Sequence, residues 1–369
     1  GEPVTVNGLI FNTSGYSVTG NTLTLAGATP TITTTTNATI SSILAGTSGI
    51  VKEGAGTLTL GSVNTYTGET TINTGTVKLG INASATNAST SALGSNAVGS
   101  NGTVVNTGST LDFNGYYVAK EAVTINGTGV GGLGALVNTG GAQSSAISFL
   151  TLGSDATIGG TGRFDLRGNT PILNMAGYTL TKKGSNSVYV TGGSITNAGN
   201  ILVEQGEFAF AGVGTFSGTS GKTITVKNTA TLTTSWSQVT VIGWDLQLEN
   251  GAKLYSYNDS GSTQNTFSGT VKIGTTVKFD TSGVMNITGN IEDLSGSGSL
   301  EKNGGSSLTL TGTNTYTGGT AIKVGTLLVN NTTGSGTGTG AVTVASGASL
   351  GGTGALTGAV TVTGKIAPG

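Results

Sequence analysis

The chain has 369 residues, a formal net charge of −1 at pH 7 and only 8% charged residues. Such a balance provides no basic footprint for binding a nucleic acid. Cysteine and histidine are both absent. Their absence excludes disulfides and cysteine-based metal sites, and it removes the commonest metal ligand and general base. We therefore expect neither a cofactor nor a nucleic-acid partner.

Glycine is unusually abundant, with 66 residues against only 4 prolines, where a share of roughly 7% is usual. Hydrophobic residues still make up 35% of the chain and alternate with polar ones, which argues against a disordered linker. This composition predicts short strands joined by tight turns. No apolar run reaches the roughly eighteen residues that a membrane-spanning helix requires.

The first 48 residues alternate apolar and polar side chains between Asn-Gly, Ser-Gly and Gly-Asn turns. Alternation with period two is typical of strands that are buried on one face. The strands expected here are 4–6, 9–11, 16–18, 22–25, 31–33 and 38–40.

Residues 49–80 hold the first copy of an internal repeat. Its centre is the pentapeptide Asn64-Thr65-Tyr66-Thr67-Gly68, whose residues favour a turn, with Lys52 before it and Gly75 after it. The alternation around these positions predicts three strands, at 57–60, 70–72 and 76–79.

Residues 81–102 are the most polar stretch and consist largely of small side chains. We expect an irregular excursion from the regular pattern, with one turn or short helix around 91–93. A binding loop is the alternative, but nothing in this stretch is chemically distinctive.

The strand pattern resumes at 103 and continues to the second copy of the repeat, at 299–330. There the pentapeptide returns as Asn314-Thr315-Tyr316-Thr317-Gly318, at a constant offset of 250 residues, and Lys302 takes the place of Lys52. Further short strands follow a Gly/Thr/Ser run at 332–340. Self-similarity of this kind marks a repeat architecture.

Short strands, glycine corners and scarce helix signals leave two architectures. A β-sandwich or barrel would need longer strands and hairpin turns, and at this length it would usually split into domains. A parallel β-solenoid stacks each coil on the one before, so that inward Leu, Val and Ile side chains form ladders. We predict an all-β fold of this second kind, as a single elongated domain over residues 1–369.

The two copies closely resemble the passenger-associated transport repeat of bacterial autotransporter passenger domains. The resemblance implies a right-handed parallel β-helix that reaches the cell surface through an outer-membrane barrel, expected outside this segment. In that family the repeat is linked to export and folding of the passenger, so its residues are structural and no catalytic residue transfers. The structural residues are Asn64, Tyr66, Gly68, Gly75, Asn314, Tyr316, Gly318 and Gly325.

Parallel β-helices also include enzymes that cleave glycans with paired carboxylates. The close acidic pairs here are Glu204 with Glu207, Glu292 with Asp293, and Asp155 with Asp165. The pair Asp155 and Asp165, together with Arg163 and Arg167, forms the best polar cluster. We interpret all of them as solvated surface charge and expect no catalytic residue. An enzyme would require a cleft that brings Asp155, Asp165 and Arg167 within hydrogen-bonding reach.

Several aromatic residues could stack against a sugar ring, although packing in the core or at its rim is the simpler expectation. The residues concerned are Tyr116, Tyr117, Tyr255, Tyr257, Trp236 and Trp244.

The sequence therefore predicts a non-enzymatic, extracellular β-solenoid segment of a large bacterial surface protein, acting as a stalk, adhesin or fibre element. The expected partner is a surface ligand, either a glycan or a protein, or copies of the chain joined end to end as a filament. A carbohydrate-active enzyme is the remaining alternative. The N-terminus lacks a basic region followed by an apolar core, so we expect a segment of a longer chain or a processed fragment.

Overall fold

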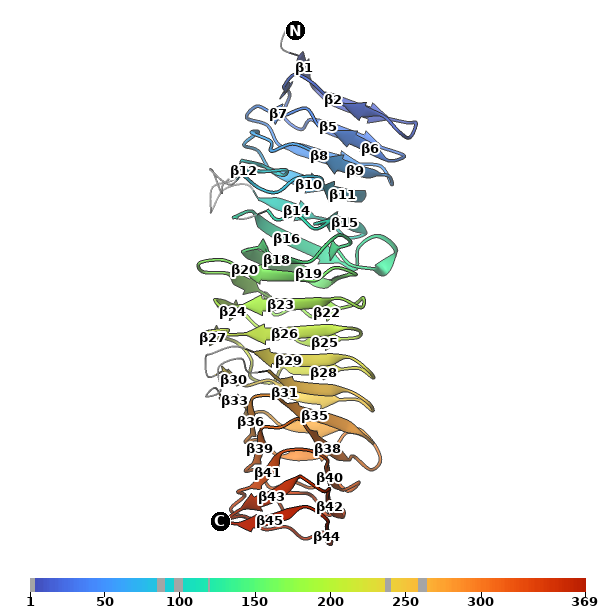
Figure 1. Ribbon diagram of the computed structural model, residues 1–369. Helices are drawn as coiled ribbons and strands as arrows, with labels where there is room; N and C mark the ends of the chain where they lie inside the picture. The colour runs from blue at the N-terminus through green and yellow to red at the C-terminus, as the bar shows by residue number, and fades with distance from the viewer. Residues whose placement is uncertain (1–3, 85–89, 96–101, 119, 236–239, 258–263) are drawn as a thin grey trace. The chain divides into compact units, whose positions relative to one another are not determined.

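The computed structural model describes all residues except 1–3, 85–89, 96–101, 119, 236–239 and 258–263. The chain divides into two units, residues 1–196 and 197–369, and each is considered by itself. The organisation as a single domain stays a prediction. Both units consist of short strands (Figure 1), and the described part of the chain contains no helix long and apolar enough to cross a membrane.

The first unit holds strands of two to twelve residues and one short 3-10 turn, η1 (Val130–Gly132). Its strands are β1 (Val4–Val6), β2 (Gly8–Phe11), β3 (Ser17–Val18), β4 (Leu23–Leu25), β5 (Thr31–Thr34), β6 (Ala38–Ile40), β7 (Leu44–Ala45), β8 (Ile50–Glu53), β9 (Thr57–Leu60), β10 (Thr70–Ile72), β11 (Gly75–Leu79), β12 (Thr90–Ser91), β13 (Gly94–Ser95), β14 (Thr103–Val105), β15 (Ser109–Asp112), β16 (Ala122–Gly127), β17 (Leu136–Asn138), β18 (Gln143–Ile147), β19 (Phe149–Gly160), β20 (Phe164–Arg167), β21 (Ile172–Asn174), β22 (Leu180–Lys182), β23 (Ser187–Thr191) and β24 (Ser194–Thr196).

The second unit is built from strands of the same kind. They are β25 (Ile201–Val203), β26 (Glu207–Ala211), β27 (Thr215–Phe216), β28 (Thr223–Val226), β29 (Thr231–Ser235), β30 (Thr240–Ile242), β31 (Asp245–Leu248), β32 (Lys253–Ser256), β33 (Gln264–Phe267), β34 (Val271–Ile273), β35 (Val277–Thr281), β36 (Val284–Ile287), β37 (Ile291–Asp293), β38 (Leu300–Asn303), β39 (Ser307–Leu310), β40 (Thr320–Ile322), β41 (Thr326–Val329), β42 (Val342–Val344), β43 (Ser349–Gly352), β44 (Val360–Val362) and β45 (Lys365–Pro368).

Successive coils of the first unit pair in parallel and in register. Strands β5, β8 and β10 lie on consecutive rungs, beside β6, β9 and β11 (Figure 1). Along the second row, Leu58 of β9 pairs with Ala38 of the preceding coil and Val77 of the following coil. All three side chains are buried, so the register places apolar residues directly above one another. The predicted parallel β-solenoid is confirmed.

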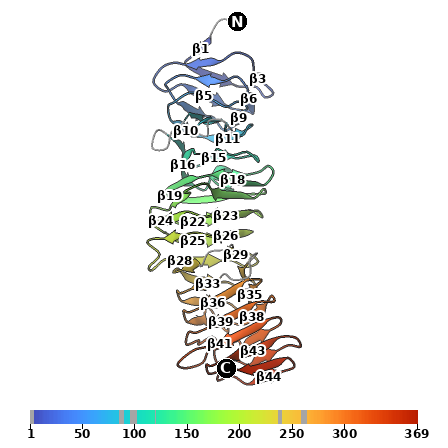
Figure 2. The same ribbon diagram turned by 60° about the vertical axis from the view of Figure 1, so that its left-hand side comes forward.

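The second unit repeats this arrangement. Figure 2 shows β36, β39, β41 and β43 following one another beside β35 and β38. One inward ladder of paired residues crosses five strands and includes a lysine. It runs Leu254, Phe279, Lys302, Ile322 and Val344. Fully burying an aliphatic or phenyl side chain contributes about 1.5–3 kcal/mol, so these ladders are the core of the unit.

Among the described residues, β12 and β13 are the exception to parallel pairing. They form a small antiparallel hairpin in which Thr90 pairs with Ser95, inside the segment 81–102 that the sequence marked as irregular.

Candidate functional site

Each repeat copy contains four strands, and the prediction of three was wrong. The additional strand is the first, β8 in one copy and β38 in the other. It was missed because its central residue is a lysine, a residue type that is almost never fully buried unless it is paired. Lys52 and Lys302 are both 0% exposed and occupy inward positions in their strands.

Each buried lysine is held by backbone carbonyl groups at a glycine corner. The ammonium of Lys52 donates to the carbonyl oxygens of Glu53 (2.9 Å), Gly54 (2.7 Å) and Thr74 (3.0 Å). Since an ammonium has three N–H donors, every donor has an acceptor. Thr74 follows β10, which pairs with β8 on the next coil, so the lysine joins the same corner of two stacked coils.

The second copy reproduces this clamp. Lys302 donates to the carbonyl oxygens of Asn303 (2.9 Å), Gly304 (2.8 Å) and Val324 (3.0 Å). Burial lowers the pKa of both Lys52 and Lys302 to about 8, against the weaker raising effects of Glu53 and Asp280. Both ammonium groups therefore stay protonated at neutral pH.

A third lysine corner lies outside the two copies. Lys182 is also 0% exposed, and it donates to the carbonyl oxygens of Lys183 (2.8 Å) and Gly184 (2.9 Å). The three corners share the spacing Lys-x-Gly with a polar residue at x. Where x is apolar, at Lys78, Lys272 and Lys323, the lysine is not buried.

The asparagine of each pentapeptide is buried and reaches the preceding coil. Asn64 is 1% exposed, and its Oδ1 accepts a hydrogen bond from the Leu44 amide at 2.9 Å. Asn314 is 2% exposed and accepts from the Ile291 amide at 2.7 Å in the same way. These side chains therefore satisfy a backbone donor of a neighbouring coil.

The tyrosine of each pentapeptide points into the core. The hydroxyl of Tyr66 lies 2.6 Å from Thr70 Oγ1, and that of Tyr316 lies 2.5 Å from Thr320 Oγ1. Both rings are 0% exposed, and burial raises the pKa of both phenols far above the usual range of tyrosine. The tyrosines are therefore unavailable to solvent or to a ligand.

The repeat glycines stand where other residues would not fit. A Cβ at Gly68 or Gly318 would come within 2.0 or 2.6 Å of backbone atoms of the preceding coil. Gly75 and Gly325 have φ of 72° and 74°, a left-handed conformation that favours glycine, and a Cβ there would lie 2.4 Å from a carbonyl oxygen. These positions require the absence of a side chain.

The best polar cluster of the sequence does not form a cleft. Asp165 is 0% exposed and makes a bidentate ion pair with Arg163, with both N–O distances at 2.7 Å. Asp155 is exposed, lies in another sheet and accepts a hydrogen bond from the Thr179 amide. Among the described residues, Asp155 and Asp165 share no hydrogen bond or ion pair.

One member of each of the other acidic pairs also binds groups of the chain itself. Thr233 Oγ1 donates to Glu207 at 2.5 Å. Asp293 accepts hydrogen bonds from the amides of Gly298 and Thr317 and from the Thr317 hydroxyl. Burial acts to raise the pKa of Asp293, but these hydrogen bonds outweigh it and lower the pKa below its usual value. In the part of the chain that the structure describes, acidic residues form no cluster able to hold a metal ion.

The aromatic residues divide between core and surface. Trp244 is 0% exposed, and its indole donates to the Gly199 carbonyl at 2.9 Å. Tyr255 lies on the outer face of β32 and Tyr257 directly after the strand, with their ring centroids 6.0 Å apart. Lys253 Nζ lies 4.5 Å from the centre of the Tyr255 ring. Tyr116 and Tyr117 are half-buried, and Trp236 lies outside the described residues.

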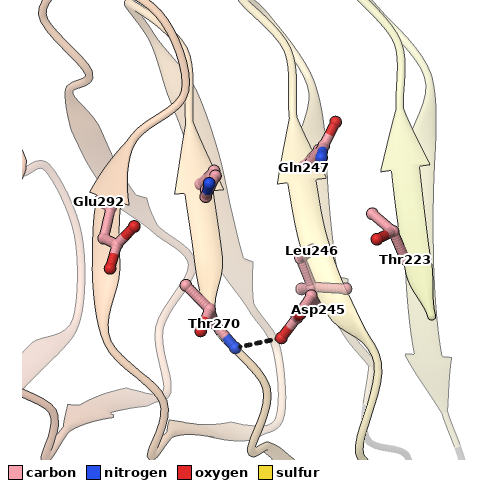
Figure 3. A pocket seen from close by; sticks show the side chains of 7 residues that line it. Thr223, Asp245, Leu246, Gln247, Thr270 and Glu292 are labelled. Atoms are coloured by element: carbon pink, nitrogen blue, oxygen red, sulfur yellow. Dashed lines mark hydrogen bonds between the residues drawn. The ribbon is translucent and has the colours of Figure 1, made fainter. Parts of the chain in front are cut away.

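One hollow of about 250 Å³ lies on the outer face of β28, β31, β34 and β37 (Figure 3). Small-molecule sites usually measure about 300–1,000 Å³ and are mostly apolar, so this hollow is too small and too polar to indicate a bound cofactor. Its lining residues are Thr223, Asp245, Leu246, Gln247, Thr270, Lys272 and Glu292.

Comparison with known proteins identifies the repeat. The family described as passenger-associated-transport-repeat matches residues 50–79 and 300–329, within the predicted windows 49–80 and 299–330. The adhesin BmaC autotransporter of Brucella suis biovar 1 (strain 1330) is 32% identical over 204 residues, which cover 53% of this chain and 6% of the relative. No solved structure matches the chain. The chain therefore carries two passenger-associated transport repeats, and over about half of its length it is similar to a small part of an autotransporter adhesin.

Proposed function

We propose that the chain is a non-enzymatic, adhesin-like scaffold displayed at the bacterial cell surface, where it serves as a stalk or holds outward side chains against a surface ligand. One observation carries this proposal. In both repeats the chemically versatile side chains, lysine, asparagine and tyrosine, are buried and engaged with groups of the chain itself. They stabilise stacked coils and are closed to a substrate.

A structural role is further supported by the carboxylates. Hydrolysis of a glycan requires two carboxyl groups that flank one bond, whereas Asp165 is buried against Arg163 and Asp155 lies on another sheet. Incubation of the purified chain with a panel of polysaccharides should release no new reducing ends. Release that disappears in Asp165→Asn would establish the enzyme instead.

The ligand is proposed to be a glycan or protein of a host surface, because the relative that matches half of this chain is an adhesin by name. Beads coated with the folded chain should adhere to host cells more than beads coated with the heat-unfolded chain. Equal adhesion would contradict the adhesin role. Periodate treatment of the cells would abolish binding to a glycan, and protease treatment would abolish binding to a protein.

End-to-end assembly is the alternative use of the same scaffold. Coils with unpaired edges can template further pairing. Electron microscopy at high protein concentration distinguishes the two roles, since a stalk segment stays as single particles and a fibre element forms filaments.

A further inference from the structure

We propose that each repeat is a receptor for a short turn of the coil that follows it, with the sequence Ser-x-x-Gly. The family match ends at residues 79 and 329. The proposed turns are residues 91–94 and 335–338, so both lie outside the matched windows. The repeat would then be complete only when the next coil has docked on its asparagine and tyrosine.

The first turn binds the pentapeptide through the backbone. The Asn64 amide donates to the Ser91 carbonyl at 2.9 Å, and Asn64 Nδ2 donates to the Ala92 carbonyl at 2.6 Å. Thr70 Oγ1, which contacts the Tyr66 hydroxyl, donates to the Leu93 carbonyl at 3.0 Å. Three successive carbonyl groups of the turn therefore accept hydrogen bonds from the repeat.

The second turn makes matching contacts in the other copy. The Asn314 amide donates to the Ser335 carbonyl at 2.8 Å, and Asn314 Nδ2 donates to the Gly336 carbonyl at 2.6 Å. The Thr339 amide donates to the Tyr316 carbonyl at 3.0 Å, as the Ser95 amide does to the Tyr66 carbonyl at 2.8 Å in the first copy.

The turn itself has two requirements. Its serine accepts a hydrogen bond within the turn, since Ser91 Oγ receives the Leu93 amide at 3.0 Å. Its glycine passes directly over the tyrosine. Gly94 has φ 105°, and a Cβ there would lie 2.6 Å from Tyr66 Cε2. At Gly338, with φ 67°, a Cβ would lie 2.1 Å from the Tyr316 carbonyl oxygen.

The two copies differ in the length of the chain that leads to the turn, and this difference argues for a specific contact. The carbonyl bonded by the asparagine Nδ2 lies 28 residues after Asn64 but 22 residues after Asn314. A turn that merely followed the repeat by chain continuity would shift with loop length. Both turns instead reach the same atoms of the repeat.

Asn64 also accepts a hydrogen bond from the Leu44 amide of the preceding coil. Docking of the turn, which holds Asn64 in place, should therefore also protect the Leu44 amide. The test compares Gly94→Ala with Gly108→Ala in the full chain. Gly108 also has a positive φ, 84°, but a Cβ there meets nothing within 4 Å. Both variants carry the backbone strain, and only Gly94→Ala presses on the tyrosine.

The readout is hydrogen exchange at the amides of Asn64 and Leu44. Gly94→Ala should accelerate exchange at both amides by about tenfold or more, as expected for a local opening, while Gly108→Ala leaves them protected. Equal protection of both amides in the two variants would overturn the proposal. If Gly94→Ala does not fold, Leu93→Ala shortens a buried side chain of the same turn without backbone strain, and the same two amides decide the question.

Discussion

The buried lysines show how a charged residue can belong to the core of a solenoid. An ammonium isolated in an apolar medium is very costly, but Lys52 and Lys302 each meet three carbonyl oxygens at their corners. Two of these carbonyl groups belong to the corner of the lysine and the third to the coil stacked on it, so the lysine joins two successive coils.

The first prediction concerns this connection. Lys52→Met keeps the length of the side chain and removes its donors, which leaves three carbonyl oxygens without their partner. We expect the free energy of unfolding to fall by about 2 kcal/mol, as measured by urea denaturation. Lys323→Met is the control, because Lys323 is exposed and its loss should change stability by less than about 0.5 kcal/mol. If both substitutions change the free energy of unfolding by a similarly small amount, the three hydrogen bonds of Lys52 do not stabilise the fold.

The second prediction is a stability maximum at alkaline pH. Burial lowers the pKa of Lys52 and Lys302 from 10.5 to about 8. Between these values the unfolded chain binds more protons than the folded chain, so the free energy of unfolding rises with pH. Burial raises the pKa of Tyr66 and Tyr316 far above 10.0. Above about pH 10 the folded chain keeps protons that the unfolded chain loses, and stability falls.

Urea denaturation from pH 7.5 to 11 measures both parts of this profile. The rise between pH 8 and 10 should be absent from the double variant Lys52→Met, Lys302→Met. The fall above pH 10 should be reduced in Tyr66→Phe, Tyr316→Phe. A profile that stays flat in the unmodified chain would show that these groups ionise alike in the folded and unfolded states.

The third prediction uses a polar atom without a partner. Thr337 is fully buried, and its hydroxyl has no hydrogen-bond partner, whereas Leu93 occupies the equivalent position in the first copy. Thr337→Val should raise the free energy of unfolding by about 1 kcal/mol, because a methyl group of similar volume replaces a buried hydroxyl that has lost its water. In Thr320→Val, the same change removes a hydroxyl bonded to Tyr316 and should destabilise the protein. Stabilisation by both substitutions would contradict the account.

At the scale of elements, the alternation of apolar and polar residues predicted the strands well where the inward residues are hydrophobic. Strands β9, β10 and β11 are found where the pattern placed them, with β11 one residue longer. The pattern failed at β8 and β38, because a hydrophobicity rule assigns a lysine to the surface. The recurrence of Lys-x-Gly with a polar residue at x, at positions 52, 182 and 302, separates these lysines from the exposed Lys272 and Lys323, where x is apolar.

The segment 81–102 was predicted as an irregular excursion, and its described part contains the β12–β13 hairpin. Its docking on Asn64 was not predictable from local sequence, because Ser91-Ala92-Leu93-Gly94 carries no unusual side chain and its contacts are made by the backbone. The matching turn at Ser335 to Gly338 shares only Ser and Gly with it.

The fourth prediction tests the role of the repeat asparagine in joining coils. Asn64→Ala leaves the Leu44 amide and the Ala92 carbonyl without partners, and each unsatisfied buried group costs about 1–3 kcal/mol. We expect a loss of about 2–4 kcal/mol in the free energy of unfolding. Asn21 is exposed, so Asn21→Ala is a matched control with an effect below about 0.5 kcal/mol. Equal effects would mean that Asn64 does not join the coils.

At the scale of the whole molecule, low charge and abundant glycine agree with coils that stack in register. Apolar residues meet along most of the inward ladders, and repeated like charges would repel each other at the spacing of about 4.8 Å between strands. Glycine allows the corners and the close approach of neighbouring coils, as at Gly68. The fold class could therefore be predicted from composition and repeats, while the two compact units have no boundary signal in the sequence.

The central claim, parallel stacking in register, can be tested with introduced cysteines because the chain has none of its own. In β5 and β8, Thr31 pairs with Val51 and Thr33 pairs with Glu53, at a spacing that allows a disulfide. Oxidation should therefore crosslink both Thr31→Cys, Val51→Cys and Thr33→Cys, Glu53→Cys, whereas Thr31→Cys, Glu53→Cys should stay reduced. A crosslink in the crossed pair, with neither parallel pair oxidised, would show antiparallel strands and contradict the solenoid.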